Sequence, residues 1–377
     1  MKLSRPLAID YTPAYHQRAG IGRLVRELVS ALARLDQETP YRLFLAGVAS
    51  PVLPSEFGAN FSLSTTRVSP NWLARIWRVR VPLQVTALCG PVSLYHATDF
   101  VLPPLPRHIP SLLTVHDLSF VCVPEAAPAR LRAYLNDVVP RSVRRATHVI
   151  ADSSATKSDL VHFYNVDPDK ISVLLSGIDL QRFCPGYVEP RLLERYGLDR
   201  PYILSVGTVQ PRKNYSRLVW ALARLRQRGY DVLLAIAGGK GWLNDDLYAT
   251  LCQSGMADFV KILGFVEESH LPGLYRGAEV LALPSLYEGF GFPVLEAMAC
   301  GTPVITSNIS SLPEVAGDAA LLVDPLDLDE ITDALQRILD YADLRQNLIA
   351  RGYLQAQKFT WSESARKLRG IYNEILR

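Results

Sequence analysis

The chain has 377 residues, 49% of them hydrophobic, which is long enough for two hydrophobic cores. The net charge is only +3, but residues 1–150 are basic, with 17 Lys and Arg against 9 Asp and Glu; no nucleic-acid motif accompanies them, so we expect no nucleic-acid partner. The five cysteines are scattered without a CxxC pair and no apolar run reaches about 18 residues, which argues against a disulfide framework, a structural zinc site and a membrane-spanning helix.

Short apolar runs alternate with longer amphipathic stretches along the whole chain. The predicted strands of the first half are Leu7–Tyr11, Tyr41–Ala46, Val92–His96, Ser111–His116, Thr147–Ala151 and Ile171–Leu175. Those of the second half are Tyr202–Val206, Val232–Ala237, Val260–Leu263, Val280–Leu283, Val304–Thr306 and Ala320–Val323. Strands rich in Val, Ile and Leu, without two-residue alternation, are typical of parallel sheets covered by helices on both faces.

This pattern predicts an α/β protein with two doubly wound, Rossmann-like domains. A Pro- and Gly-rich stretch near residues 179–200 marks the boundary. We therefore expect a first domain over residues 1–182 and a second over residues 183–360. Thr360 is the expected N-cap of a final helix, residues 361–377.

The segment from Pro284 to Pro303 carries the strongest chemical signal. A predicted buried strand leads into the turn Gly289-Phe-Gly291, and a helix with Pro293 in its first turn follows. The start of a helix presents backbone N–H groups and the positive end of the helix dipole, which favour an anionic ligand such as a diphosphate. Glu288 and Glu296 flank this turn, and their carboxylates can accept hydrogen bonds from ribose or hexose hydroxyls.

Other polar or glycine residues also follow predicted strands, where open α/β sheets bind ligands. In the first half these are Gly20 and Gly22, before the helix Ile21–Leu35, and His116. In the second half Arg212 and Lys213 follow the strand Tyr202–Val206, and two cations there suit a leaving diphosphate. The alternatives are a solvated loop for the two cations, a structural histidine for His116 and an ordinary turn for the glycines.

The chain resembles the retaining glycosyltransferases of the two-Rossmann type known as GT-B, family 4, and its motifs are most similar to bacterial mannosyltransferases of polysaccharide assembly. The resemblance is carried by Gly20-Ile-Gly-Arg23, Val115-His-Asp-Leu118, Ser205-Val-Gly-Thr-Val-Gln-Pro-Arg-Lys-Asn214, Leu263-Gly-Phe-Val266, Glu288-x7-Glu296 with the following Ala-x-Ala-Cys-Gly-Thr-Pro-Val-Ile, and Leu312-Pro-Glu-Val-Ala-Gly317. It implies two domains facing a central cleft, a donor-binding second domain, and a final helix that returns to the acceptor-binding first domain.

The resemblance also implies roles for individual residues. The catalytic residues it implies are His116, Arg212, Lys213 and Glu288. The donor-binding residues it implies are Gly20, Gly22, Thr208, Phe265, Val266, Gly289, Phe290, Gly291, Phe292 and Glu296. One position departs from the family pattern, because Thr208 follows Gly207 where an Arg is common, so Arg212 substitutes from another backbone position.

Two Asp-x-Asp strings, Asp167-Pro-Asp169 and Asp327-Leu-Asp329, are predicted to form a turn and a helix cap rather than a metal site. We therefore expect neither a metal nor a cofactor. The expected activity is transfer of a hexose in α linkage, with GDP-mannose as the first candidate donor and UDP-glucose or UDP-N-acetylglucosamine as the second. A nucleotide-sugar epimerase and a non-catalytic sugar-nucleotide binder are the alternatives from other classes.

The stretch Trp72–Arg80 is both basic and aromatic. On a helix it would form an apolar stripe flanked by Arg75, Arg78 and Arg80, which suits a membrane interface. Together with the resemblance, this stretch predicts a saccharide or undecaprenyl-diphosphate-linked acceptor. The unpaired cysteines predict a cytoplasmic protein, and this stretch adds peripheral contact at the inner face of the cytoplasmic membrane. The alternative is a helix packed on its own domain.

Overall fold

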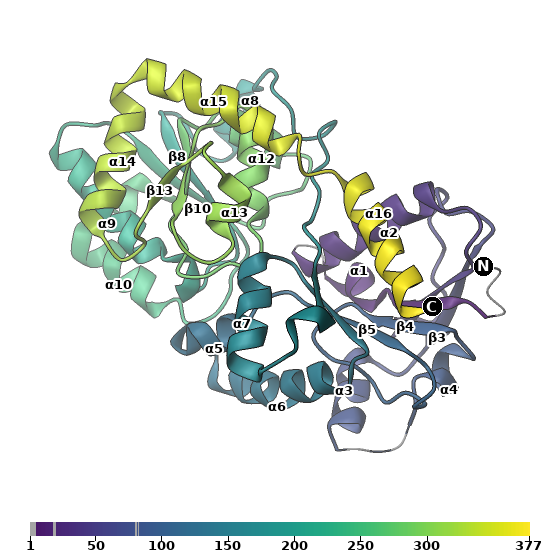
Figure 1. The fold of residues 1–377 in the computed structure, drawn as a ribbon. Helices are drawn as coiled ribbons and strands as arrows, with labels where there is room; N and C mark the ends of the chain where they lie inside the picture. The colour runs from purple at the N-terminus through teal and green to yellow at the C-terminus, as the bar shows by residue number, and fades with distance from the viewer. Residues whose placement is uncertain (1–4, 18–19, 80, 82) are drawn as a thin grey trace. The chain divides into compact units, whose positions relative to one another are not determined.

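The computed structural model describes residues 5–17, 20–79, 81 and 83–377 (Figure 1). The chain forms two compact units. The first comprises Met1–Leu118, Ala133–Gly177 and Thr360–Arg377, and the second comprises Ser119–Arg132 and Ile178–Phe359. The predicted boundary after residue 182 lies close to the change of unit at Gly177. Arg18, Ala19 and Arg80, which belong to the predicted glycine loop and basic stretch, lie outside the described residues.

The first unit is built on a seven-stranded parallel sheet in the order β3-β2-β1-β4-β5-β6-β7. Its strands are β1 (Leu7–Asp10), β2 (Tyr41–Ala46), β3 (Phe61–Thr66), β4 (Leu94–Ala97), β5 (Ser111–Val115), β6 (His148–Ala151) and β7 (Ile171–Val173). The central strands β4 and β5 are buried along their whole length. Helices covering both faces explain why these strands are apolar without alternation.

Helices and short turns complete this unit. They are α1 (Thr12–His16), α2 (Ile21–Leu35), α3 (Pro70–Arg78), α4 (Thr86–Cys89), α6 (Ala129–Arg145), α7 (Ser154–Tyr164), the 3-10 turn Pro168–Lys170 and α16 (Trp361–Ile375). Helix α6 begins in the segment that belongs to the second unit and continues into the first.

The last helix, α16, packs beside α2, as the yellow and purple helices of Figure 1 show. Thr360 caps it, with its side chain accepting a hydrogen bond from the Glu363 N–H. Tyr372 anchors it in the sheet, because its hydroxyl lies 2.7 Å from Nδ1 of the buried His96.

The second unit contains a six-stranded parallel sheet in the order β10-β9-β8-β11-β12-β13. Its strands are β8 (Tyr202–Val206), β9 (Leu233–Ala237), β10 (Val260–Gly264), β11 (Val280–Leu283), β12 (Val304–Ser307) and β13 (Leu321–Val323). Its helices are α5 (Ser119–Cys122), α8 (Pro190–Arg195), α9 (Tyr215–Gln227), α10 (Asp245–Ser254), α11 (Leu271–Arg276), α12 (Phe292–Cys300), α13 (Leu312–Ala316), α14 (Leu328–Asp340) and α15 (Ala342–Ala356), with 3-10 turns at Pro124–Ala126, Pro211–Lys213 and Ala257–Phe259.

The segment Ser119–Arg132 joins the second unit although the sequence places it among first-domain elements. Val123 and Ala126 pack against Tyr287 in a small apolar cluster. The indole Nε1 of Trp242 also donates a hydrogen bond of 2.8 Å to the Ala126 carbonyl oxygen.

The α/β class and the two doubly wound parallel sheets are confirmed. The prediction missed β3, an edge strand rich in Ser and Thr. Asp167 and Asp327 accept hydrogen bonds from backbone N–H groups in a turn and a helix cap, as predicted.

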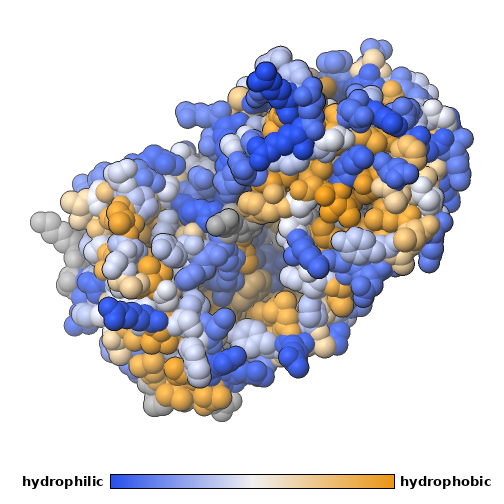
Figure 2. All heavy atoms as spheres, turned by 180° about the vertical axis from the view of Figure 1, so that it is seen from behind, coloured by the Kyte–Doolittle hydropathy of each residue, from blue (hydrophilic) through white to orange (hydrophobic). Residues whose placement is uncertain are grey.

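In the part of the chain that the structure describes, no helix has the length and apolarity needed to cross a membrane. Apolar and hydrophilic surface are interspersed on the face shown in Figure 2.

Candidate active site

Three charged side chains, two of them buried and one half-buried, form a cluster at the carboxyl edge of the second sheet. Lys213 Nζ lies 2.5 Å from Glu288 Oε1, and Arg212 Nη1 lies 2.6 Å from Glu288 Oε2. Lys213 and Glu288 are 5% and 6% exposed. The prediction named all three residues, and the structure brings them together from the loops after β8 and β11.

The cluster keeps Glu288 ionised. Burial alone would raise the pKa of Glu288, but the charges and hydrogen bonds of Arg212 and Lys213 outweigh burial and lower this pKa to about 2. Two cations against one anion leave the cluster with one net positive charge. A site of this kind favours an anionic ligand.

Hydroxyl groups hold the loop that carries Glu288. Ser285 Oγ donates to Glu288 Oε1 at 2.7 Å, and Ser310 Oγ accepts from the Glu288 N–H. Ser311 Oγ lies within hydrogen-bond distance of the carbonyl oxygens of Glu288 and Phe290. These serines were missed by the prediction, although Ser285 lies only three residues before Glu288.

Close backbone approach brings the loops after β8 and β9 together. A Cβ on Gly207 would lie 2.6 Å from Lys213 Cε, and a Cβ on Gly238 would lie 1.9 Å from the Gly207 carbonyl oxygen. Gly207 also has φ +154°, a conformation that side-chain-bearing residues rarely adopt. Thr208 follows in an exposed position on the same loop.

Helix α12 starts directly after the glycine turn. Gly291, with φ +118°, is its N-cap residue, and no side chain caps the helix. Glu296 lies inside α12, is 2% exposed, and accepts a hydrogen bond of 2.6 Å from the Tyr275 hydroxyl. Tyr275 was not predicted, and no pattern around it in the sequence indicates this contact.

The other donor-binding residues predicted in this unit differ in how far their side chains are exposed. The Phe290 ring is buried against Phe292 and Phe359, with ring centroids 5.1 and 6.0 Å apart. Its side chain therefore belongs to the core, so the predicted contact of Phe290 and Gly289 with a sugar stays a prediction about their backbone groups. After β10, Phe265 is 52% exposed whereas Val266 is 5% exposed.

In the first unit, His116 follows β5 and lies against two acceptors. Its Nδ1 is 2.8 Å from Asp152 Oδ2, and its Nε2 is 2.9 Å from the Thr98 carbonyl oxygen. Both ring nitrogens must carry a proton to satisfy an ionised Asp152 and a carbonyl together. Burial alone would lower the pKa of His116, but Asp152 outweighs it and raises this pKa to about 9.

Carboxylates follow the neighbouring strands of the same sheet edge. Asp10 ends β1, Asp99 follows β4 and Asp152 follows β6. Gln17 Nε2 donates to Asp99 at 3.0 Å, and burial raises the pKa of Asp10 to about 6. The prediction missed these residues, although the strand-end rule that found His116 would have found them.

Each of the two predicted glycines of the first unit is required at its position for a different structural reason. Gly20 adopts φ +56° and ψ −115° at the start of α2, a conformation open to glycine. A Cβ on Gly22 would lie 1.9 Å from the Gln17 carbonyl oxygen. Their predicted contact with a donor diphosphate stays a prediction, as do the roles of the other site residues.

Comparison with known proteins matches both halves of the chain. Residues 18–182 match the family described as Glycosyltransferase Family 4, and residues 194–355 match the family described as Glycosyl transferases group 1. The chain is 32% identical to the O-antigen chain mannosyltransferase B of Escherichia coli, over 93% of this chain and 94% of that protein.

Two further proteins extend this result. The chain is 33% identical to the MMP alpha-(1->4)-mannosyltransferase of Mycolicibacterium hassiacum, over 63% of this chain and 56% of that protein. A sucrose-phosphate synthase from Thermosynechococcus elongatus has a TM-score of 0.75 at 22% identity, with 98% of this chain and 99% of that chain covered. The structural likeness shows the GT-B fold.

Proposed function

We propose a specific reaction for this chain, which belongs to the family 4 glycosyltransferases of the GT-B fold and is therefore a sugar-transferring enzyme. In this proposal it transfers mannose from GDP-mannose to a saccharide acceptor with retention of configuration. The observation that carries this proposal is the cluster of Arg212, Lys213 and Glu288 beside the uncapped start of α12. Mannose is favoured because two of the similar proteins are mannosyltransferases. UDP-glucose and UDP-N-acetylglucosamine are the alternative donors.

The leaving group is a nucleoside diphosphate, which is opposite in charge to the net positive cluster. As the bond between the sugar C1 and the β-phosphate oxygen breaks, negative charge accumulates on that oxygen. Arg212 and Lys213 stabilise this charge, and the N–H groups at the start of α12 add the field of the helix dipole. The acceptor oxygen attacks C1 from the same face and passes its proton to the leaving phosphate, so no protein nucleophile and no metal is required.

The two carboxylates of the second unit have different tasks in this proposal. Glu288 holds Arg212 and Lys213 in place and contacts the donor sugar through its loop. Glu296 accepts the ribose hydroxyls, and the hydrogen bond from Tyr275 fixes its orientation.

The acceptor is proposed to lie at the carboxyl edge of the first sheet. Asp99 offers a hydrogen-bond acceptor that suits saccharide hydroxyls. His116, whose two ring N–H groups are taken by Asp152 and the Thr98 carbonyl, contributes positive charge beside it. The saccharide is proposed to be attached to undecaprenyl diphosphate, because α3 carries exposed Trp72 and Arg75 side chains suited to peripheral membrane contact. Ile76 and Trp77 are half-buried and Leu73 is buried, so the other side of α3 packs on its own unit.

The test is turnover with a panel of nucleotide sugars and a short saccharide acceptor in the presence of EDTA. We expect transfer from GDP-mannose, an α-anomeric product by NMR, and full activity without a metal. Lys213→Met should lose activity while the control variant Lys261→Met, on the edge strand β10, keeps it. An inverted product, or transfer from a UDP-sugar alone, would overturn the corresponding part of the proposal.

A further inference from the structure

A cavity of about 440 Å³ opens in the first unit between α3, α6 and the loop that follows β4. This volume lies in the range of ordinary ligand pockets. Its walls are mainly apolar side chains, namely Trp77, Val81, Val101, Leu102, Pro104 and Val138. Trp77 is fixed in this wall because its Nε1 donates a hydrogen bond of 3.0 Å to the Leu83 carbonyl oxygen.

Four arginines lie among the described residues that line this cavity, and no carboxylate does: Arg78, Arg141, Arg144 and Arg145. Arg78 and Arg141 share one acid outside the lining, Asp137, with Arg78 Nε 3.2 Å from its Oδ2. Arg145 donates to the carbonyl oxygens of Leu102 and Pro103, which holds the β4 loop against α6. Four cations against one anion leave three positive charges around an apolar hollow.

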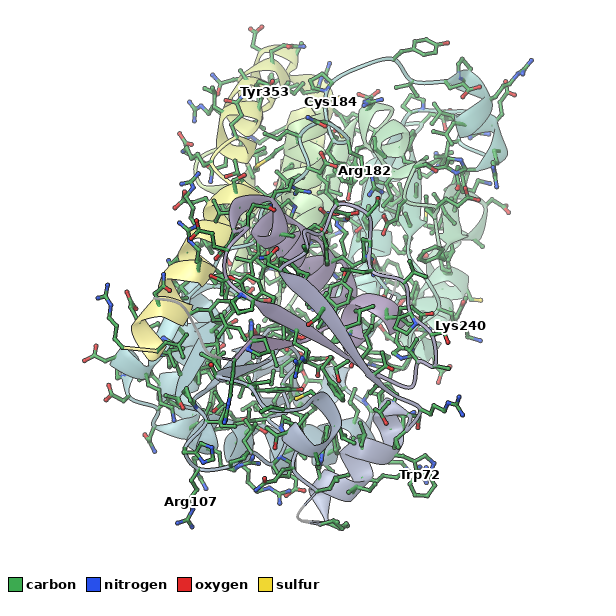
Figure 3. The ribbon with its side chains drawn as sticks, turned by 90° about the vertical axis from the view of Figure 1, so that its right-hand side faces the viewer. Trp72, Arg107, Arg182, Cys184, Lys240 and Tyr353 are labelled. Atoms are coloured by element: carbon green, nitrogen blue, oxygen red, sulfur yellow. The ribbon has the colours of Figure 1, made fainter. Side chains whose placement is uncertain are left out.

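The helix that forms one wall also exposes apolar side chains to solvent. Ser69 caps α3 and Pro70 occupies its first turn. Trp72 is 59% exposed and Val79 is 71% exposed, and Figure 3 shows Trp72 pointing outward from the ribbon. An aromatic and an aliphatic side chain beside arginines are suited to the interface of an anionic membrane.

We propose that this cavity binds a polyisoprenyl diphosphate, with the first units of its single chain in the apolar hollow and its diphosphate on the arginine rim. Guanidinium groups bind phosphate oxygens in bidentate fashion, and three surplus positive charges match a diphosphate. A glycerophospholipid with one anionic phosphate would leave part of this charge unmatched, and its two chains need more room. This site would hold the lipid part of the acceptor. The lipid-binding proposal rests on the proposed function only in assuming that the lipid carries a saccharide.

The first experiment measures binding of geranylgeranyl diphosphate to the full chain by calorimetry and through the intrinsic tryptophan fluorescence, to which Trp77 contributes with four other tryptophans. We expect saturable binding that geranylgeraniol and inorganic diphosphate each reproduce only weakly, because each lacks one half of the ligand. Ala74→Phe, which fills the cavity from α3, and Arg144→Gln, which removes one rim charge, should each weaken binding by roughly tenfold or more, or about 1.4 kcal/mol.

Arg107→Gln is the matched control, because Arg107 belongs to the same unit, is exposed and points away from the ribbon in Figure 3. It should bind geranylgeranyl diphosphate like the wild type. Equal affinity in all variants, or inorganic diphosphate binding as tightly as the lipid, would overturn the proposal. So would displacement of the bound lipid by phosphatidylglycerol vesicles at equal lipid concentration.

Thermal stabilisation by GDP separates this proposal from the proposed function. GDP should stabilise Ala74→Phe and Arg144→Gln as much as the wild type, which also shows that both variants fold. If GDP stabilises none of them while the lipid diphosphate still binds in the cavity, the donor assignment fails and the lipid site stands. If GDP stabilises all of them and the lipid binds none, the lipid site fails alone.

Discussion

Replacing Glu288 with Gln removes the one negative charge between the buried Lys213 and the half-buried Arg212. The pKa of Glu288 is lowered from 4.5 to about 2, which corresponds to about 3 kcal/mol of stabilisation at pH 7, at about 1.36 kcal/mol per pH unit. Removing one partner of a buried ion pair usually destabilises a protein by about 3–5 kcal/mol, so the two figures agree. For a unit of this size, about 3 kcal/mol lowers the melting temperature by roughly 6–12 °C.

The assay is calorimetric unfolding of the wild type and Glu288→Gln at several pH values, with Glu194→Gln, an exposed carboxylate on α8, as the control. Because the folded pKa is below the unfolded value, the stabilisation is full above pH 4.5 and is lost as the pH falls toward 2. The difference between wild type and variant should therefore be constant from pH 8 to 5 and shrink below 4.5. A Glu288→Gln protein as stable as Glu194→Gln at pH 7 would refute the reasoning.

Three further results are expected. Gly238→Ala should lose GDP-dependent stabilisation and lower kcat/KM at least about tenfold, because its Cβ would lie 1.9 Å from a carbonyl oxygen of the adjoining loop. The control Gly239→Ala, with no atom within 4 Å of its Cβ, should behave like the wild type. His116 has a raised pKa, so its stabilisation is full below pH 6.5 and is lost as the pH rises through about 9; thermal unfolding should show this loss in the wild type and a smaller one in Asp152→Asn. Tyr275→Phe removes a hydrogen bond from the buried Glu296 carboxylate and should destabilise the chain by about 1–3 kcal/mol in a denaturant titration. It should also raise the donor KM more than it lowers kcat. An unchanged KM would count against the proposed role of Glu296.

The strands that the sequence predicted are those with an apolar run, and the central ones were placed most accurately. Tyr202–Val206 and Val280–Leu283 are found with their predicted bounds, because an unbroken apolar run leaves little freedom in placing a central strand. β3 was missed because Phe61–Thr66 lies at the sheet edge, where its Ser and Thr side chains are exposed or half-buried and no apolar run is needed. Local composition cannot distinguish such a strand from a loop.

The chemistry of the site was predictable residue by residue, but its pairing was not. Lys213 and Glu288 are each found from a strand-end position, yet the ion pair joins residues 75 positions apart. Ser310 and Asp152 contribute through hydrogen bonds formed only after the sheets are assembled. Such contacts depend on tertiary packing, which a single sequence pattern does not encode.

The placement of Ser119–Arg132 determines how this protein can be cut into fragments. The chain changes unit after Leu118, Arg132, Gly177 and Phe359, so a contiguous piece covering residues 178–359 would lack part of its own core. Tyr287, next to Glu288, would lose its apolar cover, and the Trp242 indole would lose its acceptor. A stand-alone donor-binding module would therefore need residues 119–132 joined to it through a designed connection, and a simple truncation at the domain boundary would expose apolar surface beside the reacting groups.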